Sequence, residues 1–449
     1  MKTDLLTGKP IKSIVLFALP IMASSMLQYN YNLIDNMIVG RYVGTDALAA
    51  VGSVGSINGF IIGTALGLTS GFTIAVAQCF GAGDKKKMNK YAGNSITLAL
   101  IIGVIIVIVA HLLCYPLLRL LNTPENIIDM AASYLDILYF AVPIQMLLNN
   151  FNALSRAVGE SRKPLYFLIA SVFVNLVLDL LFVRYFKWGV VGAAWATNIS
   201  QMVAVILAGA YILKYNKEFS IGIYELKPDF KVSLNQIKMG IPISLQFTIT
   251  SVGSMTLQTA VNGFGANVIA GFTAAGRVEQ LTNIPMSGLG VGTMTFVSQN
   301  YGAGNYNRII KSVRKIFLLD IGVSVLCSLI LVLIGPSVVT LFMSEYNEEI
   351  MFAAKHYLKA IAQCYSLVAV LFVFRNTLQG LGFTYANTIA GAGELFGRLA
   401  IALVLTPLIG FDAVCYAGPA AWLLADIPLV VIYLRKQRKF KMLAEKEVE

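Results

Sequence analysis

Residues 78–84 read QCFGAGD, and residues 299–305 read QNYGAGN, which is the same phrase 221 positions further along the chain. The same offset pairs glycines elsewhere, for example Gly67 with Gly288. The chain is therefore predicted to be an internal duplication. Internal repeats of this length occur in many membrane proteins that are built from two related halves.

The composition excludes an ordinary soluble fold. Hydrophobic residues make up 57% of the 449 residues and charged residues 13%, whereas soluble domains average about half apolar and a quarter charged. A helix needs roughly 20 apolar residues to cross a bilayer. Twelve such stretches predict an all-α integral membrane protein, and they fall at about 14–40, 47–79, 90–117, 128–155, 164–186, 189–213, 236–262, 268–299, 309–335, 350–378, 384–407 and 411–434.

The number of spans in each half fixes how the two halves relate. Six is an even number, so both halves enter the membrane from the same side and are expected to be related by a pseudo-two-fold axis along the membrane normal. We expect an N-lobe at 1–213 and a C-lobe at 239–449, which carries a basic C-terminal tail. The charged stretch 214–238 is the only long polar connection between spans and is interpreted as a cytoplasmic linker between the lobes.

The distribution of basic residues predicts the orientation. Of the 34 Lys and Arg residues, 25 lie in the tails and loops on one side of the predicted spans and only six on the other. Because an excess of Lys and Arg marks the cytoplasmic face, both termini are expected there. The net charge of +11 thus reflects topology in a cell membrane, and it does not indicate nucleic-acid binding. The first span is too long for a cleavable signal and is expected to be retained.

Enzymatic and metal-dependent classes find little support. The five cysteines form no Cys-x-x-Cys pair and are interpreted as packing residues. His111 and His356 are the only histidines, which cannot make a His-rich metal site. The repeated Gly-Ala-Gly phrase suits a helix C-terminus and a tight turn, and it lacks the Ser or Thr of a nucleotide-binding loop. We expect no enzyme, no cofactor and no nucleic-acid partner.

Two features of the predicted helices concern packing and bending. A small residue recurs every fourth position in the second span, which allows another helix to approach closely; these residues are Gly55, Gly59, Gly63, Gly67 and Gly71. Pro20 in the first span and Pro242 in the seventh nearly correspond in the repeat. Each removes a backbone hydrogen bond and is expected to bend its helix.

Acidic residues inside apolar spans are costly and are functional candidates by default. Asp35 and Asp179 both lie roughly 8–10 Å from the outer surface at 1.5 Å per residue, and Thr197 reaches a comparable depth. Other polar residues share their helix faces at spacings of three and four, namely Gln28, Tyr31 and Asn32 with Asp35, and Ser171 and Asn175 with Asp179. These residues are predicted to share one pocket in the N-lobe.

Three interpretations of this carboxylate pair stay open. Two close carboxylates repel each other and burial penalises their charge, so one of them could take up a proton near neutral pH. The same oxygens could instead coordinate Na⁺. In the third interpretation, each acid only hydrogen-bonds to hydroxyls or backbone and stabilises the lobe.

The C-lobe presents different charged residues. Glu394 and Arg398 are four residues apart on one predicted helix, which favours a structural ion pair. Glu279 lies near the bilayer centre and could pair with Arg398 or Arg375, or could serve coupling or substrate binding. Two further acids, Asp320 and Asp426, lie near the basic face and are expected to meet Lys or Arg there.

At this point the chain resembles the multidrug and toxic compound extrusion (MATE) family, and its DinF-like branch more than the NorM branch. The resemblance spans all twelve predicted helices. It depends on the order and spacing of four stretches, which are DNMIVG at 35–40, VAQCFGAGD at 76–84, RAVGES at 156–161 and GAAWAT at 192–197.

The resemblance implies an exporter of cationic or amphipathic drugs in exchange for H⁺ or Na⁺, working by alternating access. Carried over residue by residue, the family's N-lobe cation site falls on Asp35, Asn175, Asp179 and Thr197, which would also be the ligands of any Na⁺. The proline that bends the family's first helix matches Pro20. Substrate contacts fall on Gln28, Tyr31 and Asn152, and we add Asn32 and Glu279 as substrate-binding candidates.

One departure and one alternative complete the prediction. The seventh span offers Gln246, Thr250 and Ser254 where the NorM branch carries an acid, and the tenth has no acid, so a NorM-type C-lobe Na⁺ site is not expected. The alternative function is a lipid-linked oligosaccharide flippase, for which the buried arginines Arg277, Arg375 and Arg398 would supply positive charge. The expected partners are an organic cation or amphipathic drug and membrane lipid, and the protein is expected to be a monomer.

Overall fold

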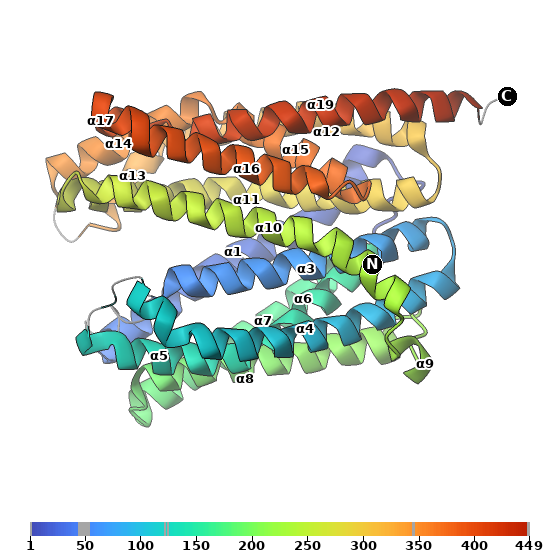
Figure 1. Ribbon diagram of the computed structural model, residues 1–449, viewed down its shortest axis with the longest axis horizontal. Helices are drawn as coiled ribbons and strands as arrows, with labels where there is room; N and C mark the ends of the chain where they lie inside the picture. Colours follow the sequence, from blue (N-terminus) through green and yellow to red (C-terminus); the bar gives the residue numbers. More distant parts are fainter. Residues whose placement is uncertain (1, 44–53, 121–122, 124, 344–345, 447–449) are drawn as a thin grey trace. The chain divides into compact units, whose positions relative to one another are not determined.

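The computed structural model describes residues 2–43, 54–120, 123, 125–343 and 346–446. Over these ranges the chain is helical and contains no β-strand (Figure 1). The prediction of an all-α membrane protein is confirmed. The start of the span predicted at 47–79 lies outside the described residues.

The predicted spans can be recognised among the helices. By length and composition, eight helices in the described ranges could cross a membrane, or ten if each of two bent pairs is one span. The bent pairs are α5 (Glu125–Phe140) with α6 (Val142–Ala157), at 46°, and α14 (Glu348–Gln363) with α15 (Ser366–Gly380), at 55°. The remaining two predicted spans correspond to α10 (Phe230–Asn262) and α11 (Ala266–Gly302), which are long but less apolar.

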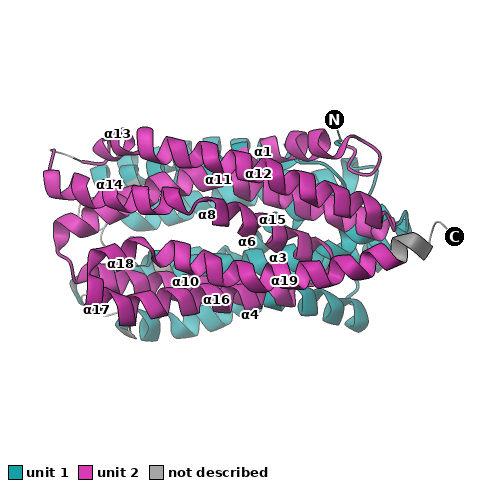
Figure 2. Ribbon diagram, turned by 90° about the horizontal axis from the view of Figure 1, so that it is seen from above, with its two compact units in different colours: residues 1–3, 23–244 teal, residues 4–22, 245–449 magenta. Residues whose placement is uncertain are grey.

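The chain forms two compact units (Figure 2). Unit 1 comprises residues 1–3 and 23–244 and unit 2 comprises residues 4–22 and 245–449, and α1 (Pro10–Tyr42) and α10 each contribute to both. The other elements of unit 1 are α3 (Gly55–Gly81), α4 (Lys85–Leu120), α5, α6, α7 (Arg162–Asp179), η1 (Leu180–Tyr185), α8 (Gly189–Ala210), η2 (Tyr211–Tyr215) and α9 (Ile223–Leu226). Those of unit 2 are α11, α12 (Tyr306–Leu333), α13 (Gly335–Thr340), α14, α15, α16 (Tyr385–Ala400), η3 (Ile401–Leu405), α17 (Thr406–Ile409), α18 (Phe411–Cys415) and α19 (Ala417–Lys446).

The first halves of α1 and α10 pack in the unit made mainly by the other half of the sequence. Ile14 and Phe17 of α1 are fully buried in the core of unit 2 together with Phe296. Gln236 of α10 is fully buried in unit 1, where its amide donates to the carbonyl oxygens of α3 and α4 at 3.0 and 2.8 Å. The predicted linker at 214–238 therefore lies within unit 1.

The two prolines lie next to the points where these helices change unit. Pro20 precedes the change after Met22, and Pro242 precedes the change after Ser244, each by two residues. Proline leaves the carbonyl four residues earlier without its helical hydrogen bond. Each proline thus removes one backbone N–H donor from its helix within two residues of the change of unit.

The repeated Gly-Ala-Gly phrase ends a helix in both copies. After α3, Gly83 has φ 71°, and after α11, Gly304 has φ 75°. Glycine adopts this left-handed conformation without the steric cost that a Cβ imposes. The next amide then bonds back five residues, from Asp84 to Cys79 at 3.1 Å and from Asn305 to Asn300 at 2.9 Å. The prediction of a helix terminus with a tight turn is confirmed.

The glycine row on α3 is only partly a packing surface. A Cβ on Gly67 would lie 2.5 Å from the Cα of Ser244, and Gly71 faces the backbone of Gly240 equally closely, so α3 and α10 touch through their backbones. No atom of the described residues lies within 4 Å of a Cβ placed on Gly55 or Gly59. The prediction of close approach is confirmed at the C-terminal end of the row, at Gly67 and Gly71, and is wrong at Gly55 and Gly59 within the described structure.

Candidate functional site

The acidic pair predicted in the first half of the sequence assembles inside unit 1. Asp35, on α1, and Asp179, on α7, lie within electrostatic range of each other. Asp179 is 1% exposed and is the last residue of α7 before the π-helical segment η1. The Asp179 carboxyl therefore lies directly before a π-helical turn, a feature that often occurs at functional sites when it interrupts an α-helix.

The second copy repeats the backbone of this site without its acid. The π-helical segment η3 follows α16 at the same 221-residue offset as η1 follows α7. The residue before it is Ala400, where unit 1 has Asp179. The backbone feature is therefore shared by the two units, and the acid is specific to unit 1.

The pair receives little electrostatic compensation from the described residues. Both oxygens of Asp179 and Oδ1 of Asp35 are buried without a hydrogen-bond partner among them. No Lys or Arg of the described ranges acts on either carboxyl. Two ionised carboxylates cannot share such an environment at a modest cost. Simultaneous negative charge on both carboxyls is therefore unfavourable in this arrangement.

Neighbouring hydroxyl groups border the carboxyl pair. Tyr31 of α1 and Thr197 of α8 are joined by a hydrogen bond of 3.3 Å between their hydroxyl oxygens. Tyr134 of α5 is 7% exposed and lies within electrostatic range of both acids and of Tyr31. Tyr134 was not among the residues predicted for this site, because a single tyrosine in an apolar span carries no distinguishing signal.

The other predicted residues of unit 1 divide into buried and exposed groups. Asn175 is 2% exposed, lies one turn before Asp179 on α7, and its Nδ2 has no partner among the described residues. Asn152 on α6 is half-buried, and its Oδ1 is likewise unpartnered there. Gln28 and Asn32 are exposed and lie within hydrogen-bonding range of each other, at 3.5 Å. The structure thus brings Asn175 to the acidic pair and leaves Gln28 and Asn32 at a surface of α1.

Glu279 belongs to unit 2 and is not part of this site. Its carboxylate accepts a hydrogen bond from the hydroxyl of Tyr357 at 2.7 Å and another from Asn283. Neither Arg398 nor Arg375 forms an ion pair with it in the described structure, although the charge of Arg398 acts on it. The ion pair with an arginine, which the sequence left open, is not formed in the described structure, because two neutral donors, Tyr357 of α14 and Asn283 of the same helix α11, bind this carboxylate instead.

A buried ion-pair network lies close to Glu279 in unit 2. Glu394 pairs directly with Arg375 of α15 and lies 3.8 Å from Arg398, four residues further along α16. The predicted Glu394–Arg398 pair is confirmed, and the stronger partner Arg375 was not foreseen. Since Arg375 lies on another helix, only the tertiary fold reveals this contact.

The expectation for the two remaining acids of unit 2 was wrong. Asp320 is 0% exposed and Asp426 is 4% exposed. Neither side chain forms a hydrogen bond or an ion pair within the described residues. Both face the interior of the helix packing, so the basic loops at the helix ends do not reach them.

Comparison with known proteins identifies the family. The family model described as MatE matches residues 20–181 and 242–396 of this chain. The chain belongs to the MatE family. The two matched segments correspond to the two copies of the repeat, and the predicted family resemblance is thereby confirmed. The DinF-like branch stays a prediction.

Curated relatives within this family align over most of the chain. The chain is 30% identical to the probable multidrug resistance protein YpnP of Bacillus subtilis, over 84% of each chain. It is 26% identical to the probable multidrug resistance protein YoeA of the same organism, over 94% of this chain and 92% of the relative. The multidrug export protein MepA of Staphylococcus aureus is 24% identical over 95% and 94%.

Solved structures share the fold. An outward-facing multidrug resistance MATE family transporter of the MOP superfamily has a TM-score of 0.88 at 24% identity, over 98% of both chains. A MATE structure in a straight conformation also scores 0.88, at 23% identity over 99% of both chains. A bent conformation scores 0.87, at 24% identity over 99% of this chain and 98% of the other. This chain is therefore a multi-pass membrane protein with the MATE fold.

Proposed function

We propose that this protein is a secondary active exporter that exchanges cationic or amphipathic organic compounds for H⁺ or Na⁺. The observation that carries the proposal is the proximity of Asp35 and Asp179. Three of their four carboxyl oxygens are buried without a hydrogen-bond partner among the described residues, and no Lys or Arg of the described structure acts on either group. Membership of the MatE family and the multidrug names of the relatives support the cargo class.

The chemistry of the pair suits antiport. When the pair holds a proton or Na⁺, its negative charge is compensated and it has little affinity for an organic cation. When that ion leaves, the exposed negative charge favours a cationic substrate. Linkage requires that ion and substrate oppose each other by equal free energies. The neutral oxygens of Asn175 and Thr197 would complete a Na⁺ coordination shell if Na⁺ is the coupling ion.

The flippase alternative is weaker in view of the charges in unit 2. Its anionic pyrophosphate cargo would need uncompensated positive charge. Arg375 and Arg398 are both engaged with Glu394, and Arg277 lies over the ring of Phe342 at 5.3 Å. The arginines that kept this function open thus have partners of their own.

The experiment is ethidium transport by proteoliposomes under separately imposed pH and Na⁺ gradients. Asp35→Asn and Asp179→Asn keep the shape of the side chains and remove their charge, and Asp320→Asn is the control, since Asp320 is equally buried but lies in unit 2. We expect gradient-driven transport to be lost in the first two variants and kept in the control. Undiminished transport in both site variants contradicts the proposal, whereas movement of a lipid-linked sugar and of no organic cation favours the flippase.

Localisation and topology follow from the same proposal. We place the protein in the cell membrane with both termini in the cytoplasm, because 25 of the 34 basic residues lie on the side of the termini. A fluorescent protein fused to the C-terminus should fold and fluoresce, and a periplasm-dependent or exterior-dependent phosphatase at the same position should be inactive. The reverse pair of results contradicts this orientation.

A further inference from the structure

Asp426 of α19 is a buried carboxyl for which neither the ion-pair network nor the acidic pair of unit 1 accounts. Its residue is 4% exposed, and both carboxyl oxygens are buried without a hydrogen-bond donor in the described part of the chain. Burying an ionised carboxylate without donors is expensive, whereas the neutral acid is far cheaper to bury. The arrangement is therefore that of a protonated side chain.

The charged groups that act on Asp426 come from α15 and α16, two of the elements packed against α19. Arg375 of α15 and Glu394 of α16 both act on it electrostatically. Arg398, also on α16, is not among the described groups that act on it, nor is Asp320 of the neighbouring helix α12. The positive charge of Arg375 thus favours the ionised form of Asp426 and the negative charge of Glu394 favours the protonated form. These two charges are paired with each other.

Arg375 has hydrogen-bonding capacity that this arrangement leaves unused. Its terminal nitrogen donates to Glu394, but its Nε is buried and has no acceptor in the described structure. A guanidinium can bond two carboxylates at once through different N–H groups. The charge of Arg375 acts on Asp426, so an ionised Asp426 would attract this guanidinium more strongly than the neutral acid does.

We propose that Asp426 is a proton-binding site in unit 2, and that release of its proton makes Arg375 share its hydrogen bonds between Glu394 and Asp426. The step is a simple ionisation, in which the carboxylic acid gives one proton to water and becomes a carboxylate. Its consequence is a change in how α19 is held against α15 and α16. The site is separate from Asp35 and Asp179, so it does not depend on the function proposed above.

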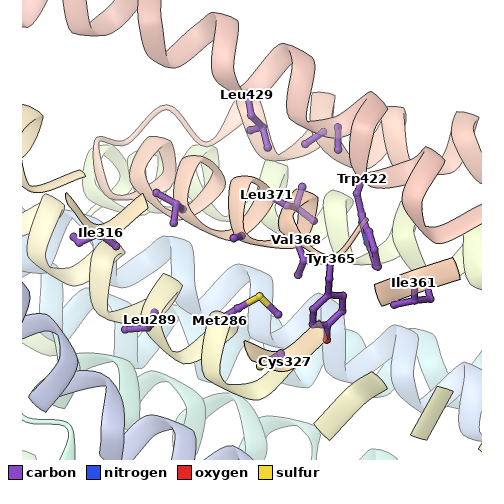
Figure 3. Packing of buried hydrophobic residues seen from close by; sticks show 14 of the residues in the cluster. Met286, Leu289, Ile316, Cys327, Ile361, Tyr365, Val368, Leu371, Trp422 and Leu429 are labelled. Carbon is purple, nitrogen blue, oxygen red and sulfur yellow. The ribbon is translucent and has the colours of Figure 1, made fainter. Parts of the chain in front are cut away.

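A tryptophan one turn away can report on this change. Trp422 of α19 is 7% exposed, and its ring meets that of Tyr365 edge-on with 6.2 Å between centroids (Figure 3). The hydroxyl of Tyr365 in turn contacts that of Thr282 on α11, at 2.7 Å. A shift of α19 would alter the packing of this indole. The chain has three tryptophans, so replacing Trp188 and Trp195 by Phe leaves Trp422 as the only indole.

The test follows two readouts in purified, folded protein from neutral to alkaline pH. Infrared spectroscopy detects the carbonyl band of a protonated carboxylic acid, and fluorescence follows Trp422 in the single-tryptophan protein. We expect an acid band at neutral pH that Asp426→Asn removes in part, and a pH-dependent change of Trp422 emission that the same variant abolishes. The control Asp320→Asn should remove a different part of the acid band and leave the emission change intact.

A second variant keeps the proposal testable if Asp426→Asn misfolds. Glu394→Gln removes the negative charge that acts on Asp426 and leaves the positive charge of Arg375, so Asp426 should then be ionised at neutral pH and its part of the acid band should be missing. An emission change that persists in Asp426→Asn overturns the proposal. An acid band that is unaltered in both variants also overturns it.

Discussion

Adding one methyl group at Gly67 should loosen unit 1, whereas adding the same group at Gly59 should not. Both residues lie on α3 in the same every-fourth-residue row. A Cβ at Gly67 would be 2.5 Å from both the N and the Cα of Ser244, against ordinary contacts of 3.4–4 Å. The obstacle is backbone on both sides, so no side chain can move aside, and α3 and α10 must separate by about 0.9 Å. Nothing lies within 4 Å of a Cβ at Gly59.

Two effects set the difference in stability between Gly67→Ala and Gly59→Ala. Replacing a helical glycine by alanine gains about 0.5–1 kcal/mol of helix propensity at either position. Overpacking at Gly67 costs about 1–3 kcal/mol. Because the propensity gain is common to both variants, Gly67→Ala should be less stable than Gly59→Ala by about 1–3 kcal/mol.

The assay is thermal unfolding in detergent, in which the apparent midpoints of the two variants and the unsubstituted protein are compared at one heating rate. A single heating rate is needed because unfolding of a large membrane protein is commonly irreversible. Gly67→Ala should unfold at the lowest temperature and Gly59→Ala at or above the unsubstituted protein. Equal midpoints for the two variants would refute the reasoning, since helix–helix contact is the only difference invoked.

Three further predictions concern single polar contacts. Asn94→Ala should destabilise the packing of the 214–238 segment by about 1–3 kcal/mol, because Asn94 is 1% exposed and accepts a hydrogen bond from the backbone amide of Asp229 at 2.8 Å. Limited proteolysis should then cut that segment faster in the variant. Hydrogen bonds, first from Lys90 and then from backbone amides, hold the pKa of Asp229 below its usual value. The contribution of Asp229 to the stability of the start of α10 is therefore present above about pH 4 and is lost as the pH falls through the lowered pKa. Hydrogen exchange at the start of α10 can follow this loss. Tyr357→Phe removes the 2.7 Å donor to Glu279 and should lower the apparent melting temperature by the equivalent of about 1–3 kcal/mol.

Each of these predictions has a matched control. Asn235→Ala, at an exposed position with one contact of 3.4 Å, should leave proteolysis unchanged. Asp229→Asn should remove the acid sensitivity at the start of α10, and persistence of that sensitivity assigns it to another group. Tyr346→Phe, at a tyrosine that is 68% exposed, should not change the melting temperature; an equal loss in both tyrosine variants contradicts the role of the buried hydroxyl.

Periodicity, spacing and depth were sufficient to predict the helical fold and the proximity of Asp35 and Asp179, whereas the role of these residues stays a prediction. The depth of Asp35 and Asp179 along their helices placed them together, because helices that cross a bilayer have a nearly fixed rise per residue. The Gly-Ala-Gly turn was predictable because its glycines act locally, within one turn of chain. These features depend on interactions that are close in sequence or constrained by the membrane.

Features that depend on which helices become neighbours were not predictable. Glu394 was assigned to Arg398, four residues away, yet its direct partner is Arg375 of another helix. Asp426 was expected to meet a basic loop and instead faces the helix interior. The glycine row of α3 gave no sign that its C-terminal members, Gly67 and Gly71, are the ones that face α10. A one-dimensional pattern shows a polar or small face, and only tertiary packing selects its partner.

The exchange of half-helices between the units bears on how such a gene could have doubled. Residues 4–22 complete unit 2, and the start of α10, up to Ser244, completes unit 1. A six-helix ancestor with this arrangement would have lacked part of its own core as a lone chain, and two copies would have had to trade their leading segments, as domain-swapped dimers do. Fusion of the two genes would then have turned a reciprocal exchange between molecules into a permanent one, which ensured that both partners were always made in equal number.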